Sequence, residues 1–376
     1  MQTLGAKEAA EALGVSLATL YAYVSRGLIR SEAGAARERR YAAADVEALL
    51  ARKEQRREPG QVARRALNWG APVMESGITL ILDGQLYYRG HDAVTLARQS
   101  TFEAVAELLW GQPFATPTPP PDLTAEGAPI ERFTVMLPRA ALLDPAALAL
   151  SPAAVAQAGT RILLLMAGAS AGSVTEALAA HWRLKGAPKR HALEAALILA
   201  ADHELNVSAF TARCVASAGA SPYGVVIAGL AALQGGRHGG HCERVEALFA
   251  EAGTPERAAS VVAGRLRRGE GIPGFGQPLY PDGDPRGREL LTLAATLKPD
   301  PLAEALRVAA RDVIREYPTI DFGLVTLTRA LGLPSGSALG LFALGRTAGW
   351  IAHALEQYAL GEMIRPRAHY TGPAPN

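Results

Sequence analysis

The sequence is poor in cysteine: Cys214 and Cys242 are the only two among its 376 residues. They form no C-x-x-C pair, and their separation is not one that metal ligands use. This scarcity excludes a disulfide-rich scaffold and a metal centre built from cysteines. We expect both thiols to be reduced and mostly buried.

Long apolar runs are also absent. The first residues, MQTLGAKEAAEALG, contain no signal-peptide core. No later run reaches membrane-spanning length without glycine, proline or charge. We therefore expect a soluble, cytoplasmic protein with no membrane partner.

Neither sign of charge dominates, since the chain contains 38 Lys and Arg and 36 Asp and Glu, which gives a formal net charge of +2. This balance excludes a nucleic-acid binder that is basic over its whole surface, but it leaves room for a local basic segment. A G-x-x-x-x-G-K-[ST] loop is missing, and the Gly/His-rich residues 235–241 lack ligand spacing. We expect no metal and no cofactor.

Helical patterns fill most of the chain, whose length suggests two or three domains. No internal repeat and no parallel-sheet alternation occurs, so the fold class is mainly α. A short hairpin around Asp83-Gly84 is predicted over 78–90, and a helix over 100–110. From Ser151 onward we expect helices over roughly 152–168, 191–201, 209–218, 222–233, 242–252, 255–268, 301–317, 324–331 and 338–358.

The first residues follow a different plan. A short helix over 6–13, a turn at Gly14-Val15 and a helix over 17–25 capped by Ser16 give a helix-turn-helix outline. A wing around 37–41 and a third helix over 43–57 follow. This order resembles the winged helix-turn-helix of the MerR and excisionase type, in which the second helix enters the major groove and the wing meets phosphate.

That resemblance implies DNA as a partner. Residues 1–65 hold 12 Lys and Arg against 8 Asp and Glu, a net charge of +4. A small domain for protein contact or oligomerisation is the alternative, with the two tyrosines partly in its core. The residues implied in DNA binding are Thr19, Tyr21, Tyr23 and Arg26 at the second helix and Arg37, Arg39 and Arg40 at the backbone.

A glycine- and proline-rich stretch over 271–287, GIPGFGQPLYPDGDPRG, predicts an irregular loop that a ligand can approach closely. Other distinctive motifs occur in order: DHELNVS at 202–208, GGRHGG at 235–240, YPTIDFG at 317–323, GRTAGWIAH at 345–353 and RPRA at 365–368. Together, from about residue 75 to residue 372, these motifs resemble the citrate synthase family.

The resemblance implies an almost entirely helical catalytic part. The predicted organisation is a helix-turn-helix domain over 1–57, a linker over 58–70, and a citrate-synthase-like large domain over 71–240 and 323–376 that is interrupted by a small domain over 241–322. The resemblance also implies that one arginine of the site reaches in from a second subunit, so we expect at least a homodimer, with a hexamer as the alternative.

The implied reaction joins acetyl-CoA, or another acyl-CoA, to oxaloacetate or a related 2-oxo acid, as in the tricarboxylic acid cycle. The acyl group becomes an alkyl group, and the CoA thioester is a substrate rather than a cofactor. Such a site needs a base near a weakly acidic methyl group and a donor near the thioester oxygen. By resemblance Asp321 is the base and His238 is the donor.

Cationic clamps for the dicarboxylate are also implied, because an arginine can hold a carboxylate with two parallel hydrogen bonds. The family pattern assigns oxaloacetate binding to His203, Arg286, Arg346 and Arg365, the last reaching in from the other subunit. Arg367 competes with Arg365 for that role, since RPRA offers both.

Gln277 departs from the family, which carries GFGHRVY where this chain has Gly274-Phe275-Gly276-Gln277-Pro278-Leu279-Tyr280. The replaced histidine polarises the oxaloacetate carbonyl and supplies a proton to the alkoxide. A glutamine amide can donate a hydrogen bond but cannot act as an acid. Two hypotheses follow: an acyltransferase whose activity is reduced at Gln277, or a DNA-binding regulator whose second domain senses acyl-CoA, oxaloacetate or citrate without turnover.

Overall fold

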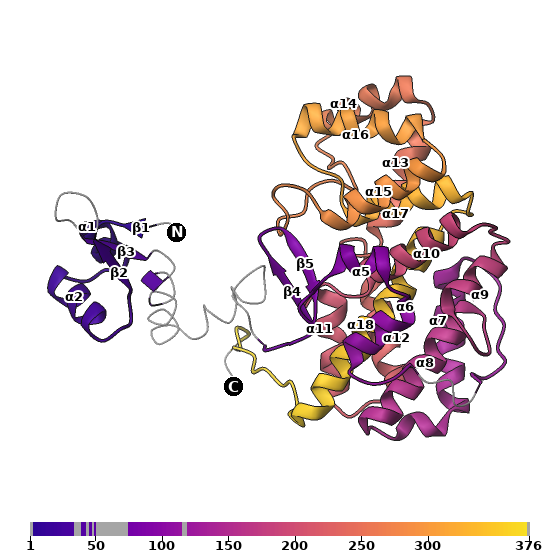
Figure 1. Cartoon of the computed structure of the whole chain (residues 1–376), viewed down its shortest axis with the longest axis horizontal. Coiled ribbons are helices and arrows are strands. Elements are labelled where there is room, and N and C mark those ends of the chain that lie inside the picture. Colours follow the sequence, from indigo (N-terminus) through magenta and orange to yellow (C-terminus); the bar gives the residue numbers. More distant parts are fainter. Residues whose placement is uncertain are drawn as a thin grey trace. The chain divides into compact units, whose positions relative to one another are not determined.

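The computed structural model describes residues 3–33, 39–42, 45–46, 49, 74–114 and 119–373 (Figure 1). The chain forms two compact units, Met1–Glu75 and Ser76–Asn376. The predicted linker over 58–70 lies outside the described residues. Over the described part the structure is mainly helical, which confirms the predicted fold class.

The first unit contains two helices and a small sheet. Its elements are β1 (Thr3–Leu4), α1 (Ala6–Ala12), α2 (Leu17–Ser25), β2 (Ser31–Ala33) and β3 (Arg39–Ala42), with the strands antiparallel in the order β1-β3-β2. Ser16 caps α2 by accepting a hydrogen bond from the main-chain N–H of Thr19 at 3.3 Å. Leu20, Ile29 and Tyr41 form the centre of a small separate core.

The second unit begins with a three-stranded antiparallel sheet. It consists of β4 (Thr79–Leu82), β5 (Gln85–Tyr88) and β6 (His91–Asp92). Leu82 pairs with Gln85 across the Asp83-Gly84 turn, which confirms the predicted hairpin. Asp83 and Gly84 both have positive φ, the backbone conformation that this dipeptide tolerates in a tight hairpin.

Helices make up the rest of the second unit. In chain order they are α5 (Ala93–Gln99), α6 (Phe102–Trp110), α7 (Pro129–Leu143), η2 (Pro145–Leu148), α8 (Pro152–Ala167), α9 (Val174–His181), α10 (Ala187–Ala200), α11 (Val207–Ser217), α12 (Pro222–Leu233), α13 (His241–Ala252), η3 (Pro255–Arg257), α14 (Ala258–Arg267), α15 (Pro285–Leu297), α16 (Pro301–Ile314), α17 (Ile320–Leu331) and α18 (Ser337–Leu360).

The long helix α18 runs through the middle of this unit and is buried along most of its length (Figure 1). Its glycines let α10 approach closely. A methyl group on Gly345 would lie 2.5 Å from the carbonyl oxygen of Leu197, and one on Gly349 would overlap the carbonyl oxygen of Ala201. This close packing brings the end of α10 against the part of α18 that carries Arg346.

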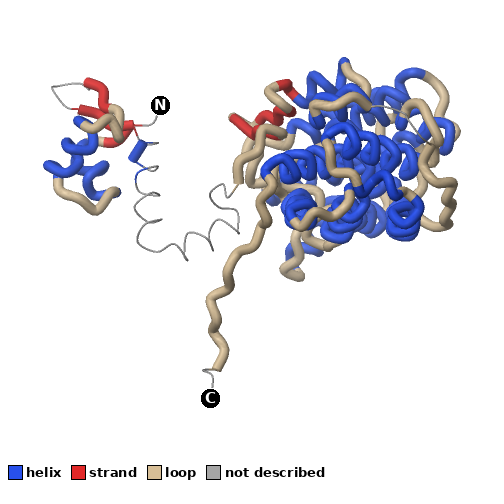
Figure 2. Tube along the Cα trace, turned by 90° about the horizontal axis from the view of Figure 1, so that it is seen from below, coloured by secondary structure: helices blue, strands red, loops and turns tan. Residues whose placement is uncertain are grey.

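Helices α13, α14 and α16 gather at one end of the unit, and α15 and α17 lie between them and the other helices (Figure 1). Helices α15 and α17 pack against each other, and α13 packs against α17. After α18 the chain leaves the helices as an extended segment (Figure 2).

Several predicted features of the later chain are wrong, and no helix was predicted over 285–297, where α15 lies. The loop predicted over 271–287 ends at Asp284, because proline suits the first position of a helix and α15 starts at Pro285. The helix predicted from 324 starts at Ile320. The helix predicted over 255–268 is divided into η3 and α14. The third helix of the first unit, predicted over 43–57, lies mostly outside the described residues.

Candidate active site

His203 lies in the segment that joins α10 to α11. The segment ends at Asn206, which caps α11 by accepting hydrogen bonds from the main-chain amides of Ser208 and Ala209, both at 3.1 Å. The His203 side chain is buried, and its Nε2 lies 2.9 Å from the hydroxyl of Tyr280. Burial, followed by the nearby positive charges of the site, holds the pKa of His203 well below its usual range.

Asp202 and His353 form a fully buried pair beneath this segment. Nε2 of His353 lies 3.2 Å from Oδ1 of Asp202, and the hydroxyl of Thr79 donates to Oδ2 at 2.6 Å. Burial alone would raise the pKa of Asp202. Its interactions with His353 and with the guanidinium of Arg346 have the opposite effect and are larger together, so the pKa is lowered. A negative charge is thus fixed one residue from His203.

His238 lies in the glycine-rich turn that precedes α13, as predicted. Its Nε2 is 2.8 Å from the hydroxyl oxygen of Ser208, and the indole N–H of Trp350 donates a hydrogen bond to the same oxygen at 3.1 Å. Burial, with Arg346 and His241 nearby, lowers the pKa of His238 to about 3. The ring is therefore neutral near pH 7, and its Nδ1 has no hydrogen-bond partner in the described part of the chain.

Asp321 occupies the first turn of α17, the second residue of the helix. The thiol of Cys242 donates to its Oδ1 at 3.2 Å, and the hydroxyl of Thr319 donates to its Oδ2 at 3.3 Å. Burial raises the pKa of Asp321 although both donors and the nearby cations oppose the shift. A carboxylate in such surroundings is a stronger base than one in water.

Arg286 lies in the first turn of α15 and is held by Asp284 two residues earlier. Its Nε and one terminal nitrogen donate to the two carboxylate oxygens at 2.9 and 2.8 Å. Burial alone would lower the pKa of the guanidinium, but Asp284 outweighs it and the pKa is raised. The guanidinium also lies 5.4 Å from the centre of the Tyr280 ring, a cation–π contact.

Arg346 projects from the buried middle of α18. Its Nε donates to the carbonyl oxygen of Ala200 at 2.7 Å, and its guanidinium lies 4.8 Å from the centre of the Phe342 ring. Among the described residues no carboxylate lies within ion-pair distance of it. Burial lowers the pKa of Arg346 to about 10, and the positive charge of Arg286 acts in the same direction. Two buried guanidinium groups that repel each other favour an anion between them.

Gln277 is half-buried in the loop before α15. Gly276 donates its main-chain N–H to Tyr317 at 3.0 Å, and Thr319 donates its own to Gly274 at 2.9 Å. These bonds fix the loop beside the residues that lead into Asp321. Within the described part of the chain, the side-chain oxygen of Gln277 accepts one hydrogen bond, a long one of 3.4 Å from the N–H of Leu279.

Arg365 stands apart from the other predicted clamps. It lies in the extended segment after α18, is exposed, and makes no ion pair among the residues that the structure describes. The same holds for Arg367. Five other predicted residues lie within electrostatic reach of one another: Arg286 and Arg346 act on His203, Arg346 acts on His238, and Arg286 acts on Asp321.

The residues predicted to contact DNA lie in the first unit. Tyr21 is about half exposed at 51 %, while Thr19 and Tyr23 of α2 are partly buried. Arg26 ends α2, and Arg39 and Arg40 lie in β3; all three are exposed. Arg37 lies outside the described residues.

Sequence reasoning missed several residues that hold the site in place. They are Cys242 and Thr319 at Asp321, Trp350 at Ser208, Tyr280 at His203, Asp284 at Arg286, and the Asp202–His353 pair. The sequence marked these supporting residues only by their proximity to the motifs. Proximity does not reveal which side chain each of them contacts.

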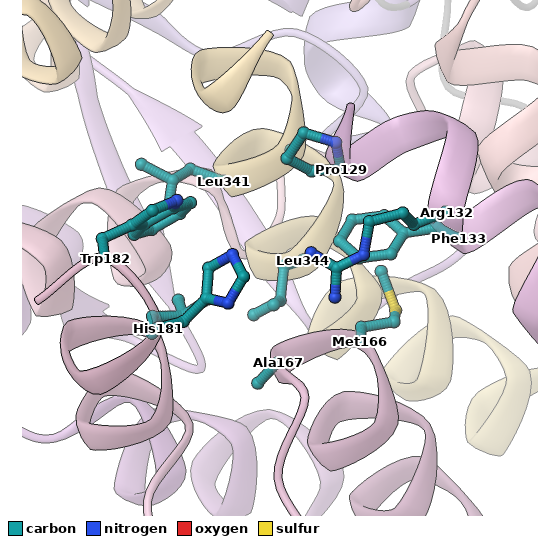
Figure 3. Close-up of a pocket in the computed structure, with 11 residues that line it drawn as sticks. Pro129, Arg132, Phe133, Met166, Ala167, His181, Trp182, Leu341 and Leu344 are labelled. Atoms are coloured by element: carbon teal, nitrogen blue, oxygen red, sulfur yellow. The ribbon is translucent and has the colours of Figure 1, made fainter. Parts of the chain in front are cut away.

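A separate small cavity lies between α7, α8, α9 and α18 (Figure 3). Its lining is mostly apolar, and the side chains of Arg132 and His181 point into it. None of the residues predicted for catalysis lines it. Among the described residues no cluster of His, Cys, Asp and Glu is suited to a metal ion, and no helix has the length and apolar character needed to cross a bilayer.

Comparisons with known proteins identify two families in this chain. The profile of the family described as "Citrate synthase, C-terminal domain" matches residues 137–367, and that of "Helix-turn-helix domain" matches residues 3–54. The chain is 36 % identical over 189 residues to citrate synthase 2 of Bacillus subtilis, covering 48 % of this chain and 51 % of that protein. It is 32 % identical over 202 residues to 2-methylcitrate synthase of Shewanella oneidensis, covering 52 % and 54 %. The chain thus spans about half the length of these curated relatives.

Two solved structures share the fold. Citrate synthase of Thermotoga maritima superposes with a TM-score of 0.68 at 25 % identity, covering 82 % of this chain and 95 % of that one. Citrate synthase of Thermoplasma acidophilum, solved as a ternary complex with carboxymethyl coenzyme A and oxaloacetate, has a TM-score of 0.67 at 23 % identity, covering 81 % and 95 %.

Proposed function

Because the chain belongs to the citrate synthase family, we propose that it condenses acetyl-CoA, or another acyl-CoA, with oxaloacetate or a related 2-oxo acid. The products would be citrate, or its homologue, and free CoA. The observation that carries this proposal is one buried group of side chains: Asp321 with a raised pKa, neutral His238 with Nδ1 unpaired among the described residues, and Arg346 without a carboxylate partner.

Each of these groups suits one step of the reaction. Asp321 takes a proton from the methyl carbon of the thioester, which its raised pKa favours. In the tautomer in which Nε2 accepts a hydrogen bond from the Ser208 hydroxyl, the Nδ1–H of His238 donates to the thioester oxygen as that oxygen gains charge. The contact with Ser208 also holds the ring. The methylene carbon then attacks the carbonyl of the 2-oxo acid, and water releases CoA from the resulting thioester.

The substrate carboxylates require cations that are already in position. Arg286 and Arg346 are buried, and their side chains are fixed by Asp284 and by the carbonyl of Ala200. A guanidinium held in this way loses little conformational entropy when it binds a carboxylate. The oxaloacetate complex of the Thermoplasma acidophilum protein supports a dicarboxylate as the ligand class. An exposed Arg365 suits a role in the site of a second subunit.

Gln277 sets the expected rate. Its amide can polarise the carbonyl of the 2-oxo acid but cannot protonate the developing alkoxide. Loss of a positioned acid commonly lowers a rate by roughly 10²–10⁴. The proposed enzyme is therefore slow, with a water molecule supplying the proton.

Product identification tests this function. The purified protein, incubated with oxaloacetate and either acetyl-CoA or propionyl-CoA, should form citrate or methylcitrate together with free CoA, detected by mass spectrometry. Formation of CoA without a condensed acid would indicate thioester hydrolysis and would overturn the proposal.

A second candidate is a DNA-binding regulator whose second unit senses acyl-CoA, oxaloacetate or citrate. The match of residues 3–54 to a helix-turn-helix domain and the glutamine at position 277 favour it. It requires metabolite binding without turnover and DNA binding that changes with the metabolite. A mobility shift of genomic fragments with and without oxaloacetate and acetyl-CoA separates it from the enzyme.

A further inference from the structure

The thiol of Cys242 contacts the carboxylate of Asp321. Cys242 is the second residue of α13, immediately after the glycine-rich turn of His238, and its side chain is fully buried. Its Sγ lies 3.2 Å from Oδ1 of Asp321. An ionised carboxylate only accepts hydrogen bonds, so the thiol is the donor.

Each carboxylate oxygen of Asp321 has one side-chain donor. The second donor is the hydroxyl of Thr319, 3.3 Å from Oδ2. The two donors come from segments far apart in sequence, α13 and the residue that precedes α17. Together they fix the rotation of the carboxylate about its last bond, which decides where its lone pairs point.

We propose that Cys242 is a positioning residue for the base: its S–H group orients Oδ1 of Asp321 and sets the strength of that carboxylate. This inference rests on the proposed role of Asp321 as the base. A thiol is a weak donor, whereas a hydroxyl or an amide is a stronger one. A weak donor orients the carboxylate while leaving it most of its basicity.

The electrostatics of the pair agree with a donor role. Burial, followed by Asp321 itself, raises the pKa of the Cys242 thiol well above its usual range, so the thiol keeps its proton and is not a nucleophile. Other charges face the pair from every side. His241 of α13 and Arg286 of α15 act on Asp321, and Asp321 acts on Arg346 of α18. Glu243 and Glu246 of α13 act on Cys242.

Two variants at Cys242 separate a hydrogen bond from mere packing. Cys242→Ala removes the donor, and Cys242→Ser keeps a donor and strengthens it. Cys214→Ala is the matched control, because Cys214 on α11 contacts none of the site residues in the structure as described. The pKa of Asp321 should rise in Cys242→Ala by about half a unit to one unit and should return to or below its original value in Cys242→Ser.

The pH dependence of unfolding measures this without turnover. The folded-state pKa of Asp321 is raised above its unfolded value, so ionisation of Asp321 destabilises the fold above that pKa. Removal of the donor raises the folded pKa further. Cys242→Ala should therefore be less stable than the unmodified protein, and this difference should grow as pH rises through the folded-state pKa of Asp321. Across this pH range the unfolding equilibrium constant of the variant should increase about three- to tenfold relative to that of the unmodified protein.

Asp321→Asn provides the decisive background, because an amide does not titrate. In that background the pH-dependent part of the Cys242→Ala deficit should vanish, and the deficit of Cys214→Ala should be independent of pH throughout. A Cys242→Ala deficit that is the same at every pH, or that persists unchanged with Asp321→Asn, would overturn the proposal. Since no substrate is present, this result is independent of whether the protein condenses acyl-CoA with a 2-oxo acid.

Turnover gives a second readout. In the proposed enzyme the acidic limb of the kcat profile should move to higher pH in Cys242→Ala and should be restored in Cys242→Ser. If kcat falls in both variants but the acidic limb of its pH profile does not move, Cys242 contributes only to packing, and the proposed role of its thiol is overturned.

Discussion

The carboxylate of Asp284 accepts a hydrogen bond from the main-chain N–H of Ile320 at 3.0 Å. The same carboxylate holds the guanidinium of Arg286 with two further bonds. Ile320 is the first residue of α17, and Asp321 follows it. One buried aspartate thus ties the proposed substrate clamp to the helix turn that carries the proposed base.

Asp284→Asn should therefore weaken both the fold and the site. It leaves the buried Arg286 without its counter-ion, and loss of one partner of a buried pair costs about 3–5 kcal/mol. Urea unfolding measures the loss, and calorimetry should show weaker oxaloacetate binding. Glu304→Gln is the control, since Glu304 pairs with Arg307 at the surface and its loss should cost less than about 1 kcal/mol. Equal losses for both variants would contradict the account.

His238 predicts a pH dependence of stability. Its folded-state pKa is about 3, below the unfolded value, so its contribution is fully present above pH 6.5 and is lost as pH falls toward 3. Between these values one group contributes a slope of up to about 1.4 kcal/mol per pH unit. His238→Asn should have a shallower slope between pH 6 and pH 4 in urea unfolding. Parallel slopes in the two proteins would show that His238 does not titrate as described.

Gln277→His should accelerate condensation, because the new imidazole can give a proton to the alkoxide. The gain should be at least about tenfold and lie within the range expected for a positioned acid. Gln277→Asn serves as the control, since it retains an amide and should not gain. Initial rates of CoA release measure both variants. An unchanged or lower rate in Gln277→His would mean that Gln277 does not limit the reaction.

Arg40→Ala should weaken DNA binding equally for all sequences. Arg40 is exposed on β3, where the predicted wing meets phosphate. Each lost phosphate contact should reduce the slope of log affinity against log salt by about 1. Fluorescence anisotropy with a duplex between about 50 and 200 mM salt measures this slope. Lys298→Ala, an exposed change in the second unit, should leave it unaltered. Binding that does not depend on salt would favour a protein-contact role for the first unit.

Much of the fold follows from local sequence patterns. Apolar residues at helical spacing marked most helices from α8 onward, and the Asp83-Gly84 turn marked the hairpin. Helix α15 was not predicted at all, because glycine and proline dominate 271–287, although Pro285 is itself a helix-start signal. The start of α17 was placed four residues too late, at 324 instead of Ile320.

The site was only partly predictable for a different reason. Motifs nominated His203, His238, Asp321, Arg286 and Arg346, but the side chains that fix them come from distant segments. Cys242 and Asp321 are 79 residues apart, and Trp350 and Ser208 are 142 apart. Such contacts depend on helix packing and leave no local pattern, so a single sequence does not reveal them.

The most direct measurement is the initial rate of CoA thiol release by the purified protein, with acetyl-CoA and oxaloacetate, compared with its Asp321→Asn variant. The account predicts slow release that requires oxaloacetate and that falls by a factor of at least about 10² in the variant, since the base is lost. Absence of release, or release that continues unchanged without Asp321 or without oxaloacetate, would contradict the condensing function.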